Sequence, residues 1–314
     1  MTITAEQPNV WFDGEFLDSS RATVGLRTHS LHYGLGAFEG TRAYRQQDGS
    51  TAVFRLGDHL DRLERSCRML MLDLPYSGET LAAATLELLR RNRLEAGYIR
   101  HLVFLGAGAM GLLPRDNPVR VAILTWPWGA YLGDDGLERG IRCRISSHQR
   151  AFPNSGLTKA KATGGYIPSI LAKREALAAG VDDSLMLDTQ GFVAEATGAN
   201  LFVVSDGRLF TPPPTHILEG ITRDTILALA RMEGIETVER PLPRDDIYAA
   251  DEAFLTGTAA EVTPIREVDG RLLRAGGRGP VTARLQERFF ALTRGEFSLG
   301  ADWLTPLGEG VLPA

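Results

Sequence analysis

Cysteine is scarce in this sequence, because its 314 residues contain only Cys67 and Cys143. Two cysteines cannot build a disulfide framework, and this pair lacks the spacing of a metal site. Long apolar runs are also missing, since no run reaches the ~18 residues that a membrane helix needs. The N-terminal residues show neither a basic cluster nor an apolar core, which predicts that there is no secretory signal. These absences predict a cytoplasmic protein in a reducing compartment, with no membrane partner.

Positive charge is not in excess either: 34 Lys and Arg face 39 Asp and Glu, for a formal net charge of −5. Without a basic stripe, nucleic acid is not expected as a partner. His29 and His32 lie three residues apart but have no third ligand nearby, so no metal site is predicted. The length allows one or two domains.

Strand and helix patterns alternate along the chain, which predicts a mixed α/β protein. Between two short strand patterns, the Asp13-Gly14 dipeptide predicts a hairpin. Asp58 is expected to cap a helix whose apolar stripe is Leu60, Leu63, Cys67 and Leu70. The glycine-rich connection after Trp126 predicts a domain boundary. We therefore expect a smaller N-terminal domain (1–127), an interdomain loop (128–140) and a larger C-terminal domain (141–314).

A glycine loop from Gly106 to Gly111 fits the spacing G-x-G-x-x-G and follows a predicted strand. A dinucleotide site needs a helix after this loop, but Pro114 and Pro118 prevent one. The loop therefore predicts a connection between two strands.

Lys161 is followed by a carboxylate and then by a helix start. Glu195 lies between apolar residues and a turn, and Gly220 leads into an amphipathic segment from Arg223 to Met232. A lysine can bond to an aldehyde, a buried acid can pair with a protonated ring nitrogen, and a helix N-terminus can bind phosphate. Pyridoxal phosphate carries these three groups, so the pattern predicts this cofactor. Lys159 competes with Lys161, and spacing alone does not choose between the two.

A longer gapped motif runs through the same region: Glu195, Asn200-Leu201-Phe202, Leu209-Phe210-Thr211, Leu218, Gly220-Ile221 and Arg223. It resembles the signature of class IV, fold-type-IV pyridoxal-phosphate enzymes. The similarity to bacterial branched-chain amino acid aminotransferases covers nearly the whole chain and includes Val10–Gly14, Leu31–Gly34, Phe38–Gly40, Tyr98–Arg100, Pro127–Gly133 and Gly257–Glu261. The resemblance implies a two-domain fold of type IV with the cofactor between the domains.

The resemblance also implies which residues contact the cofactor. Its pattern of a lysine followed five residues later by a tyrosine selects Lys161, which would form the Schiff base and carry the proton during catalysis. Glu195 would hold the ring nitrogen protonated, and Tyr166 would bond the phenolic oxygen. The other implied contacts, mostly around the phosphate, are Arg62, Leu218, Gly220, Ile221, Thr222 and Thr258.

The implied activity is transfer of the amino group of L-leucine, L-isoleucine or L-valine to 2-oxoglutarate. Tyr98 and Arg100 share one face of a predicted strand, and an arginine can hold the distal carboxylate of 2-oxoglutarate with two bonds. The amides of Thr258 and Ala259 would receive the α-carboxylate. The other predicted substrate contacts are Tyr33, Phe38, Arg42, Leu112, Trp128 and Tyr131. Leu112 would reach in from the second subunit of a homodimer.

Three other functions fit parts of the sequence. A D-amino acid or (R)-amine transaminase shares the fold and cofactor, but the Arg-x-His arrangement of the D-amino acid enzymes is absent, because His101 directly follows Arg100. A pyridoxal-phosphate lyase of the aminodeoxychorismate type is less favoured, because the role expected of Arg100 in binding a second carboxylate fits a transaminase better. A nicotinamide-dependent oxidoreductase would rest on the glycine loop alone. The sequence departs from common family patterns near the cofactor and pocket, at Gly36, Ala37, Thr41 and Glu219, and this leaves the substrate range open.

Overall fold

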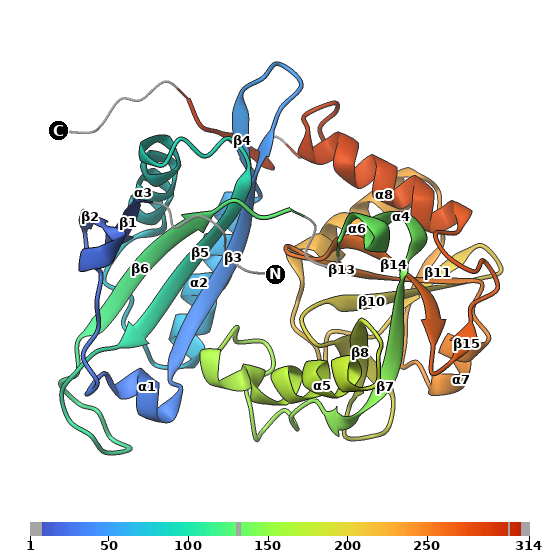
Figure 1. The fold of residues 1–314 in the computed structure, drawn as a ribbon, viewed down its shortest axis with the longest axis horizontal. Coiled ribbons are helices and arrows are strands. Elements are labelled where there is room, and N and C mark those ends of the chain that lie inside the picture. The colour runs from blue at the N-terminus through green and yellow to red at the C-terminus, as the bar shows by residue number, and fades with distance from the viewer. Residues whose placement is uncertain (1–7, 130–132, 301, 309–314) are drawn as a thin grey trace. The chain divides into compact units, whose positions relative to one another are not determined.

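The computed structural model describes residues 8–129, 133–300 and 302–308. It consists of two compact units (Figure 1): unit 1 contains Met1–Gly129, Ala160–Gly164 and Thr293–Ala314, and unit 2 contains Ala130–Lys159 and Gly165–Leu292. The sequence groups Lys161 with the C-terminal residues, whereas the structure clusters its five-residue segment with unit 1. No helix of the described part of the chain is long and apolar enough to cross a membrane.

Unit 1 is built on an antiparallel sheet of seven strands in the order β16-β4-β3-β5-β6-β1-β2. The strands are β1 (Asn9–Phe12), β2 (Glu15–Asp18), β3 (Gly36–Arg45), β4 (Thr51–Phe54), β5 (Gly97–Leu105), β6 (Val119–Trp126) and β16 (Leu304–Pro306). The expected hairpin at Asp13 and Gly14 joins β1 to β2, and both residues have positive φ. The central pair, β3 and β5, is in register from Gly36 opposite Phe104 to Ala43 opposite Gly97.

Two long helices of unit 1, α2 (Leu56–Met69) and α3 (Gly78–Arg91), lie side by side against the sheet (Figure 1). The shorter helices are η1 (Ser19–Arg21) and α1 (His29–Tyr33). Of the predicted stripe, Leu60, Leu63 and Cys67 are buried in the core, and Leu70, the C-cap residue, is partly buried against it. The prediction that Asp58 caps α2 is wrong. The helix begins after Arg55, whose φ is 53°, and Asp58 in the first turn pairs with the Arg55 guanidinium at 2.6 Å.

Unit 2 contains a nine-stranded sheet that closes on itself. Its main path is β12-β11-β10-β13-β14-β7-β8-β9, β15 pairs with β14, and a further pairing joins β10 to β9. The strands are β7 (Ile141–Gln149), β8 (Asp183–Leu187), β9 (Val193–Ala196), β10 (Asn200–Ser205), β11 (Arg208–Thr211), β12 (Thr237–Glu239), β13 (Glu252–Gly257), β14 (Glu261–Val268) and β15 (Arg271–Leu272). The closing pair is Asn200 opposite Glu195. The predicted cofactor carboxylate therefore lies at the seam of this ring of strands.

The helices of this part of the chain are α4 (Asp134–Arg139), η2 (Thr163–Tyr166), α5 (Ile167–Ala178), α6 (Ile221–Met232), α7 (Arg244–Tyr248) and α8 (Pro280–Thr293), and the first two residues of η2 belong to unit 1. α5 packs on β7 and β8, and α6 packs on β13. Alternating residues of the strands form the core, so that Leu201, Val203 and Leu255 belong to one apolar cluster. Phe202 and Phe254, on the opposite face, stack with their ring centroids 5.1 Å apart.

The glycine loop joins β5 to β6 without a helix, as the sequence predicts. The Asn117 side-chain amide donates to the carbonyls of Gly106 and Ala109. A Cβ at Gly108 would lie 2.6 Å from the Asn117 carbonyl oxygen. The glycines therefore let this loop fold tightly around its own asparagine.

Candidate active site

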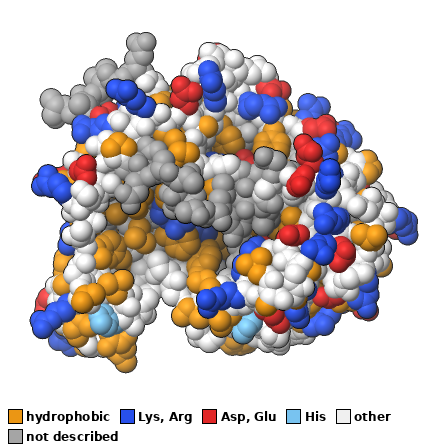
Figure 2. Space-filling view, in the orientation of Figure 1, with side chains coloured by type: hydrophobic (Ala, Val, Ile, Leu, Met, Phe, Trp, Pro, Cys, Tyr) orange, Lys and Arg blue, Asp and Glu red, His pale blue; other side chains and the backbone are white. Residues whose placement is uncertain are grey.

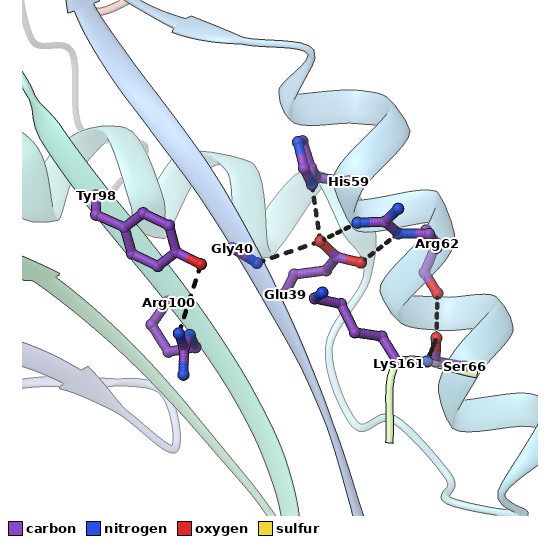
Figure 3. A network of polar contacts seen from close by, with 8 residues as sticks. All are labelled: Glu39, Gly40, His59, Arg62, Ser66, Tyr98, Arg100 and Lys161. Carbon is purple, nitrogen blue, oxygen red and sulfur yellow. Dashed lines mark hydrogen bonds and ion pairs between the residues drawn. The ribbon is translucent and has the colours of Figure 1, made fainter. Parts of the chain in front are cut away.

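Lys161 lies on a short segment of unit 1 between β3 and α2. Its carbonyl accepts from the Phe38 amide at 3.0 Å, and its own amide donates to the Ser66 hydroxyl at 3.1 Å. Ala162 forms an isolated antiparallel bridge with Ala37, so the segment lies beside β3 and pairs with it at one residue pair. The Lys161 side chain points towards Glu39 (Figure 3), and its Nζ lies 4.9 Å from the centre of the Phe38 ring.

A buried carboxylate, Glu39, organises the polar contacts around this lysine (Figure 3). Arg62 donates to it twice, from Nε to Oε1 at 2.6 Å and from Nη2 to Oε2 at 2.9 Å. His59 lies 2.7 Å from Oε2 through Nδ1. The Glu39 side chain is fully buried and those of His59 and Arg62 nearly so. α2 thus brings the predicted phosphate arginine beside Lys161 and ties it to β3.

The charge states of this group follow from its burial. Burial alone would raise the pKa of Glu39, but the Arg62 charge and the His59 contact outweigh it and hold the pKa well below its usual range. Burial lowers the pKa of His59, against the opposing effect of Glu39. An ionised carboxylate can only accept a hydrogen bond, so the proton of a neutral His59 resides on Nδ1.

Tyr98 and Arg100 project from the same face of β5, as the sequence predicts. The Arg100 guanidinium lies 4.7 Å from the ring centre of Phe38, 5.4 Å from that of Tyr98 and 5.7 Å from that of Trp126. Its Nη2 donates to the Tyr98 hydroxyl at 3.4 Å, and its buried Nε has no hydrogen-bond partner among the described residues. No carboxylate of the described chain pairs with it.

Gly40 makes this arrangement possible. A Cβ at this position would lie 1.7 Å from the Tyr98 hydroxyl oxygen, which is far inside van der Waals contact. Gly40 is opposite Arg100 in the sheet, so the missing side chain leaves room for the phenol that the arginine contacts. The Phe38-Glu39-Gly40 motif therefore supplies an aromatic wall, a carboxylate and this space.

The other predicted substrate residues of unit 1 have varied surroundings. Arg42 is buried and donates from Nη2 to the carbonyls of Trp128 and Gly129 at 2.5 and 2.7 Å, so it holds the chain that follows β6. Tyr33 is 46% exposed and donates to the Met110 carbonyl, and Leu112 is 86% exposed. The Trp128 ring meets the Tyr98 ring edge-on at 4.6 Å. Tyr131 lies outside the described residues.

In unit 2, Glu195 is held by groups from three parts of the chain. Its Oε2 accepts from the Asn200 side-chain amide at 3.0 Å and from the Leu218 amide at 3.4 Å. Its Oε1 lies 2.9 Å from Arg150 Nε, which forms an ion pair but lacks the alignment of a hydrogen bond. The Glu195 side chain is 7% exposed. The motif residues Glu195, Asn200 and Leu218 thus meet at the seam of the sheet.

The predicted phosphate-binding helix start is present as α6. Its N-cap is Gly220, and no side chain caps the helix. Asn200 fixes this position, because its Nδ2 donates to the Leu218 carbonyl and a Cβ on Gly220 would lie 1.9 Å from its Oδ1. Ile221 and Thr222, the first two helical residues, are buried. The remaining predicted residues of unit 2 are partly buried: Tyr166 at the N-cap of α5, and Thr258 and Ala259 in the turn after β13.

Lys159, the competing lysine, has a different environment. Its Nζ pairs with Glu219 at 3.0 Å, and both side chains are about half exposed, at 50% and 41%. An exposed pair of this kind contributes little to stability. The geometry therefore favours Lys161 as the reactive lysine.

Sequence reasoning did not assign roles to Glu39, His59, Ser66 or Arg150. A signal for two of them exists, because His59, Arg62 and Ser66 follow at spacings of three and four and share one face of α2. Arg150 had no such signal, since it reaches Glu195 across 45 residues of chain.

No group of three metal-binding side chains occurs within residues 8–129, 133–300 and 302–308. His29 and His32 instead contact the carbonyls of Gly111 and Leu26.

The family described as "Amino-transferase class IV" matches residues 36–268, a range that includes Lys161, Glu195 and the start of α6. The branched-chain-amino-acid aminotransferase of Pseudomonas aeruginosa is 49% identical over 305 residues, which is 97% of this chain and 99% of that protein. The chain belongs to the class IV aminotransferases.

Solved structures of class IV aminotransferases share the fold over nearly the whole length. The branched-chain amino acid aminotransferase of Escherichia coli aligns with a TM-score of 0.94 at 43% identity, covering 96% of this chain and 100% of that one. The T.th. branched-chain amino acid aminotransferase, complexed with N-(5′-phosphopyridoxyl)-L-glutamate, aligns with a TM-score of 0.91 at 39% identity, covering 96% and 99%. The same T.th. enzyme, complexed with 4-methylvaleric acid, gives 0.92 at 39% identity, covering 98% and 100%.

Proposed function

We propose that this class IV aminotransferase moves the amino group of L-leucine, L-isoleucine or L-valine to 2-oxoglutarate with pyridoxal phosphate as cofactor. The observation that carries the substrate assignment is Arg100, a guanidinium set among three aromatic rings without a carboxylate partner in the described chain. Such a group can bind the distal carboxylate of 2-oxoglutarate or glutamate, while the rings beside it accept an apolar side chain.

The residues present fit the cofactor. Bound pyridoxal phosphate supplies an aldehyde carbon for an amine and a ring that accepts electrons. Lys161 offers the amine beside Arg62, and α6 offers uncapped N-terminal amides that suit a phosphate. Gly220 keeps that helix start clear of side-chain atoms, because a Cβ there has no room. The phosphate contacts proposed here are Arg62, Gly220, Ile221, Thr222 and Thr258.

Each protein group then has a defined task. Lys161 Nζ would carry the proton from the substrate α-carbon to the carbon that bears the cofactor's aldehyde, and would carry it back in the second half of the reaction. Glu195 keeps the ring nitrogen protonated. The Asn200 side-chain amide and the Leu218 backbone amide hold this carboxylate in place through its Oε2. Tyr166 bonds the phenolic oxygen. The amides of Thr258 and Ala259 receive the α-carboxylate, as a turn after a strand can do.

The relatives support the choice of substrates. The T.th. enzyme binds a glutamate adduct of the cofactor in one structure and 4-methylvaleric acid, a branched apolar acid, in another. His101 argues against the arrangement of D-amino acid enzymes, because it is fully buried and contacts the Thr85 hydroxyl at 2.8 Å. It therefore lies on the opposite face of β5 from Arg100.

We also propose that the active form is a homodimer. Large apolar side chains are exposed on α1, on the chain just before it and on the loop after β5: Leu31, Leu26, Met110, Leu112 and Leu113. Figure 2 shows hydrophobic side chains exposed on the face in view. Exposed apolar groups gathered in this way are typical of an association surface. Sedimentation at micromolar concentration should give twice the mass of the 34.2 kDa chain.

A cytoplasmic location is consistent with the two thiols. Cys67 and Cys143 are both free and buried, and burial raises the pKa of Cys67 to about 12. Fractionation of the source cells, followed by an assay with L-leucine, would test this location.

The Lys161→Ala variant tests the proposed function. It should bind pyridoxal phosphate without the visible absorption of a lysine-bound cofactor and should not transaminate L-leucine, because the proposed base is gone. Lys159→Ala is the matched control and should keep both properties, since it removes only a half-exposed ion pair. If Lys159→Ala loses the absorption instead, Lys159 is the reactive lysine and the assignment to Lys161 is wrong. A wild-type enzyme that reacts with a D-amino acid or an (R)-amine but never with L-leucine would replace the proposed substrates.

A further inference from the structure

The lysine segment is fixed on one side by the sheet of unit 1. The Phe38 amide donates to the Lys161 carbonyl at 3.0 Å, and the Thr163 hydroxyl donates to the Gly34 carbonyl at 2.7 Å. The Gly164 amide also donates to the Gly34 carbonyl. These bonds hold the carbonyl side of Lys161 and the residues after it, but they leave its amide to be held by another group.

Ser66 on α2 is that group. Its hydroxyl accepts from the Lys161 amide at 3.1 Å and donates to the Arg62 carbonyl at 2.8 Å. An amide can only donate and a carbonyl can only accept, so the two partners fix the hydroxyl orientation. Ser66 is 0% exposed, so solvent does not compete for either bond.

A serine bond to the carbonyl four residues earlier is common in helices and has no functional meaning by itself. The bond to Lys161 differs, because it joins residues 95 positions apart. It attaches the reactive lysine to the same turn of helix that carries Arg62. Arg62 in turn is attached to β3 through Glu39.

We propose that Ser66 is a positioning residue for Lys161, and that its hydroxyl sets the place of the lysine main chain relative to Arg62. This inference rests on the proposed function, in which the amine of Lys161 and the guanidinium of Arg62 serve opposite ends of one cofactor. A rigid spacing between the two suits a ligand of fixed length. In this role Ser66 acts through the lysine backbone.

The first test is amide hydrogen exchange in the full-length protein, with and without added pyridoxal phosphate. Ser66→Ala should make the Lys161 amide exchange roughly two- to tenfold faster, since one buried hydrogen bond is lost. Ser66→Cys keeps the volume with a weaker acceptor and should give a smaller increase. Exchange equal to that of the wild type in Ser66→Ala would overturn the proposal, whatever the enzyme activity.

Thr85→Val is the matched control. Thr85 is also 0% exposed, lies on α3 of the same unit and donates to the carbonyl four residues earlier, Leu81, at 2.6 Å. It makes no contact with the lysine segment among the described bonds. A general loss of helix stability should affect both variants, whereas faster exchange at Lys161 should occur only in Ser66→Ala. Equal acceleration in both would overturn the proposal.

The second test uses the enzyme with its cofactor. Ser66→Ala should lower kcat for L-leucine about tenfold or more with KM within about twofold, because a misplaced base slows the reaction without weakening substrate contacts. The pH midpoint of the visible absorption should also shift. Faster amide exchange with unchanged kcat and spectrum would mean that Ser66 holds the backbone but does not position the amine, which overturns the proposal. Failure of the proposed function would instead remove the absorption in the wild type and leave the exchange result intact.

Discussion

Glu39 in unit 1 and Glu195 in unit 2 are both buried carboxylates beside an arginine, yet their surroundings differ. Glu39 receives two well-aligned bonds from Arg62 and one from His59, all from α2. Glu195 faces Arg150 in an ion pair without hydrogen-bond alignment, and its other contacts come from β10 and the chain before α6. The side chains that contact Glu39 thus come from one helix, whereas Glu195 lies where the sheet of unit 2 closes.

This difference suggests separate tasks for two residues of the same type. A buried ion pair with saturated bonds holds elements together, and breaking it leaves a charge without compensation. A carboxylate whose neighbouring arginine is not aligned for a hydrogen bond can also pair with a cationic ligand. We therefore expect Glu39 to control the stability of unit 1 and Glu195 to control the reaction.

The largest effect is expected for Glu39→Gln. It should lower the free energy of unfolding of unit 1 by about 3–5 kcal/mol, because the charge that binds Arg62 is removed. All four tryptophans of the sequence lie in unit 1, so tryptophan fluorescence during urea unfolding reports this unit. Glu195→Gln is the control and should shift that transition far less. Equal shifts in both variants would contradict the division of tasks.

Glu195→Gln should reverse the pattern. A neutral amide cannot keep the ring nitrogen protonated. The cofactor should stay bound, but the activation free energy should rise by about 3 kcal/mol, which lowers the rate 10²-fold or more. Single-turnover absorbance with L-leucine measures this rate. A rate equal to that of the wild type would show that Glu195 is not the ring partner.

Arg100→Ala extends the comparison to the arginines, because Arg62 is bound by Glu39 whereas no described carboxylate binds Arg100. The rate of the half-reaction with 2-oxoglutarate should fall roughly ten- to a hundredfold, because losing a charge-assisted bond costs about 1.5–3 kcal/mol. The half-reaction with L-leucine serves as the internal control and should change much less. An equal loss in both would make Arg100 structural.

The smallest effect concerns pH. Burial lowers the pKa of His101 to about 4, so between pH ~6.5 and ~4 the unfolded chain binds more protons at this residue than the folded one. Stability of unit 1 should therefore fall by about 1–2 kcal/mol from pH 7 to pH 5. His59, whose pKa is also lowered, acts in the same direction.

His101→Gln is the variant that isolates this residue. It should flatten the pH dependence of the tryptophan-detected transition between pH 7 and 5. A slope as steep as that of the wild type in His101→Gln would assign the acid sensitivity to other groups. The effect of Glu39 belongs to lower pH, since its depressed pKa stabilises the fold above ~4.5 and is lost only as pH falls further.

Local features of this protein could be read from its sequence. The apolar stripe of α2, the hairpin at Asp13 and Gly14, and the glycine start of α6 each depend on neighbouring residues, and the structure confirms them. The cap of α2 could not be read in this way. Arg55 adopts a left-handed conformation and draws Asp58 into the first turn, which competes with the usual preference of aspartate for the N-cap.

Side-chain partners that lie far apart in the sequence could not be predicted, for a different reason. Glu39 meets His59 and Arg62 only after β3 and α2 have packed, and Arg150 meets Glu195 only when the sheet of unit 2 closes. The sequence marks such residues as charged but does not say which charges face each other. The choice of Lys161 over Lys159 accordingly came from resemblance, and the variants above test it.

Unit 1 also has a consequence for how the protein is made. Its sheet includes β16 at residues 304–306, and its lysine segment is 160–164, although most of the unit precedes residue 130. At a synthesis rate of ~5–20 residues per second, the N-terminal part waits roughly 9–35 s for its last strand. The part of the chain that is made first is therefore the part completed last, and a ribosome-bound fragment ending before β16 should expose the β4 edge to chaperones.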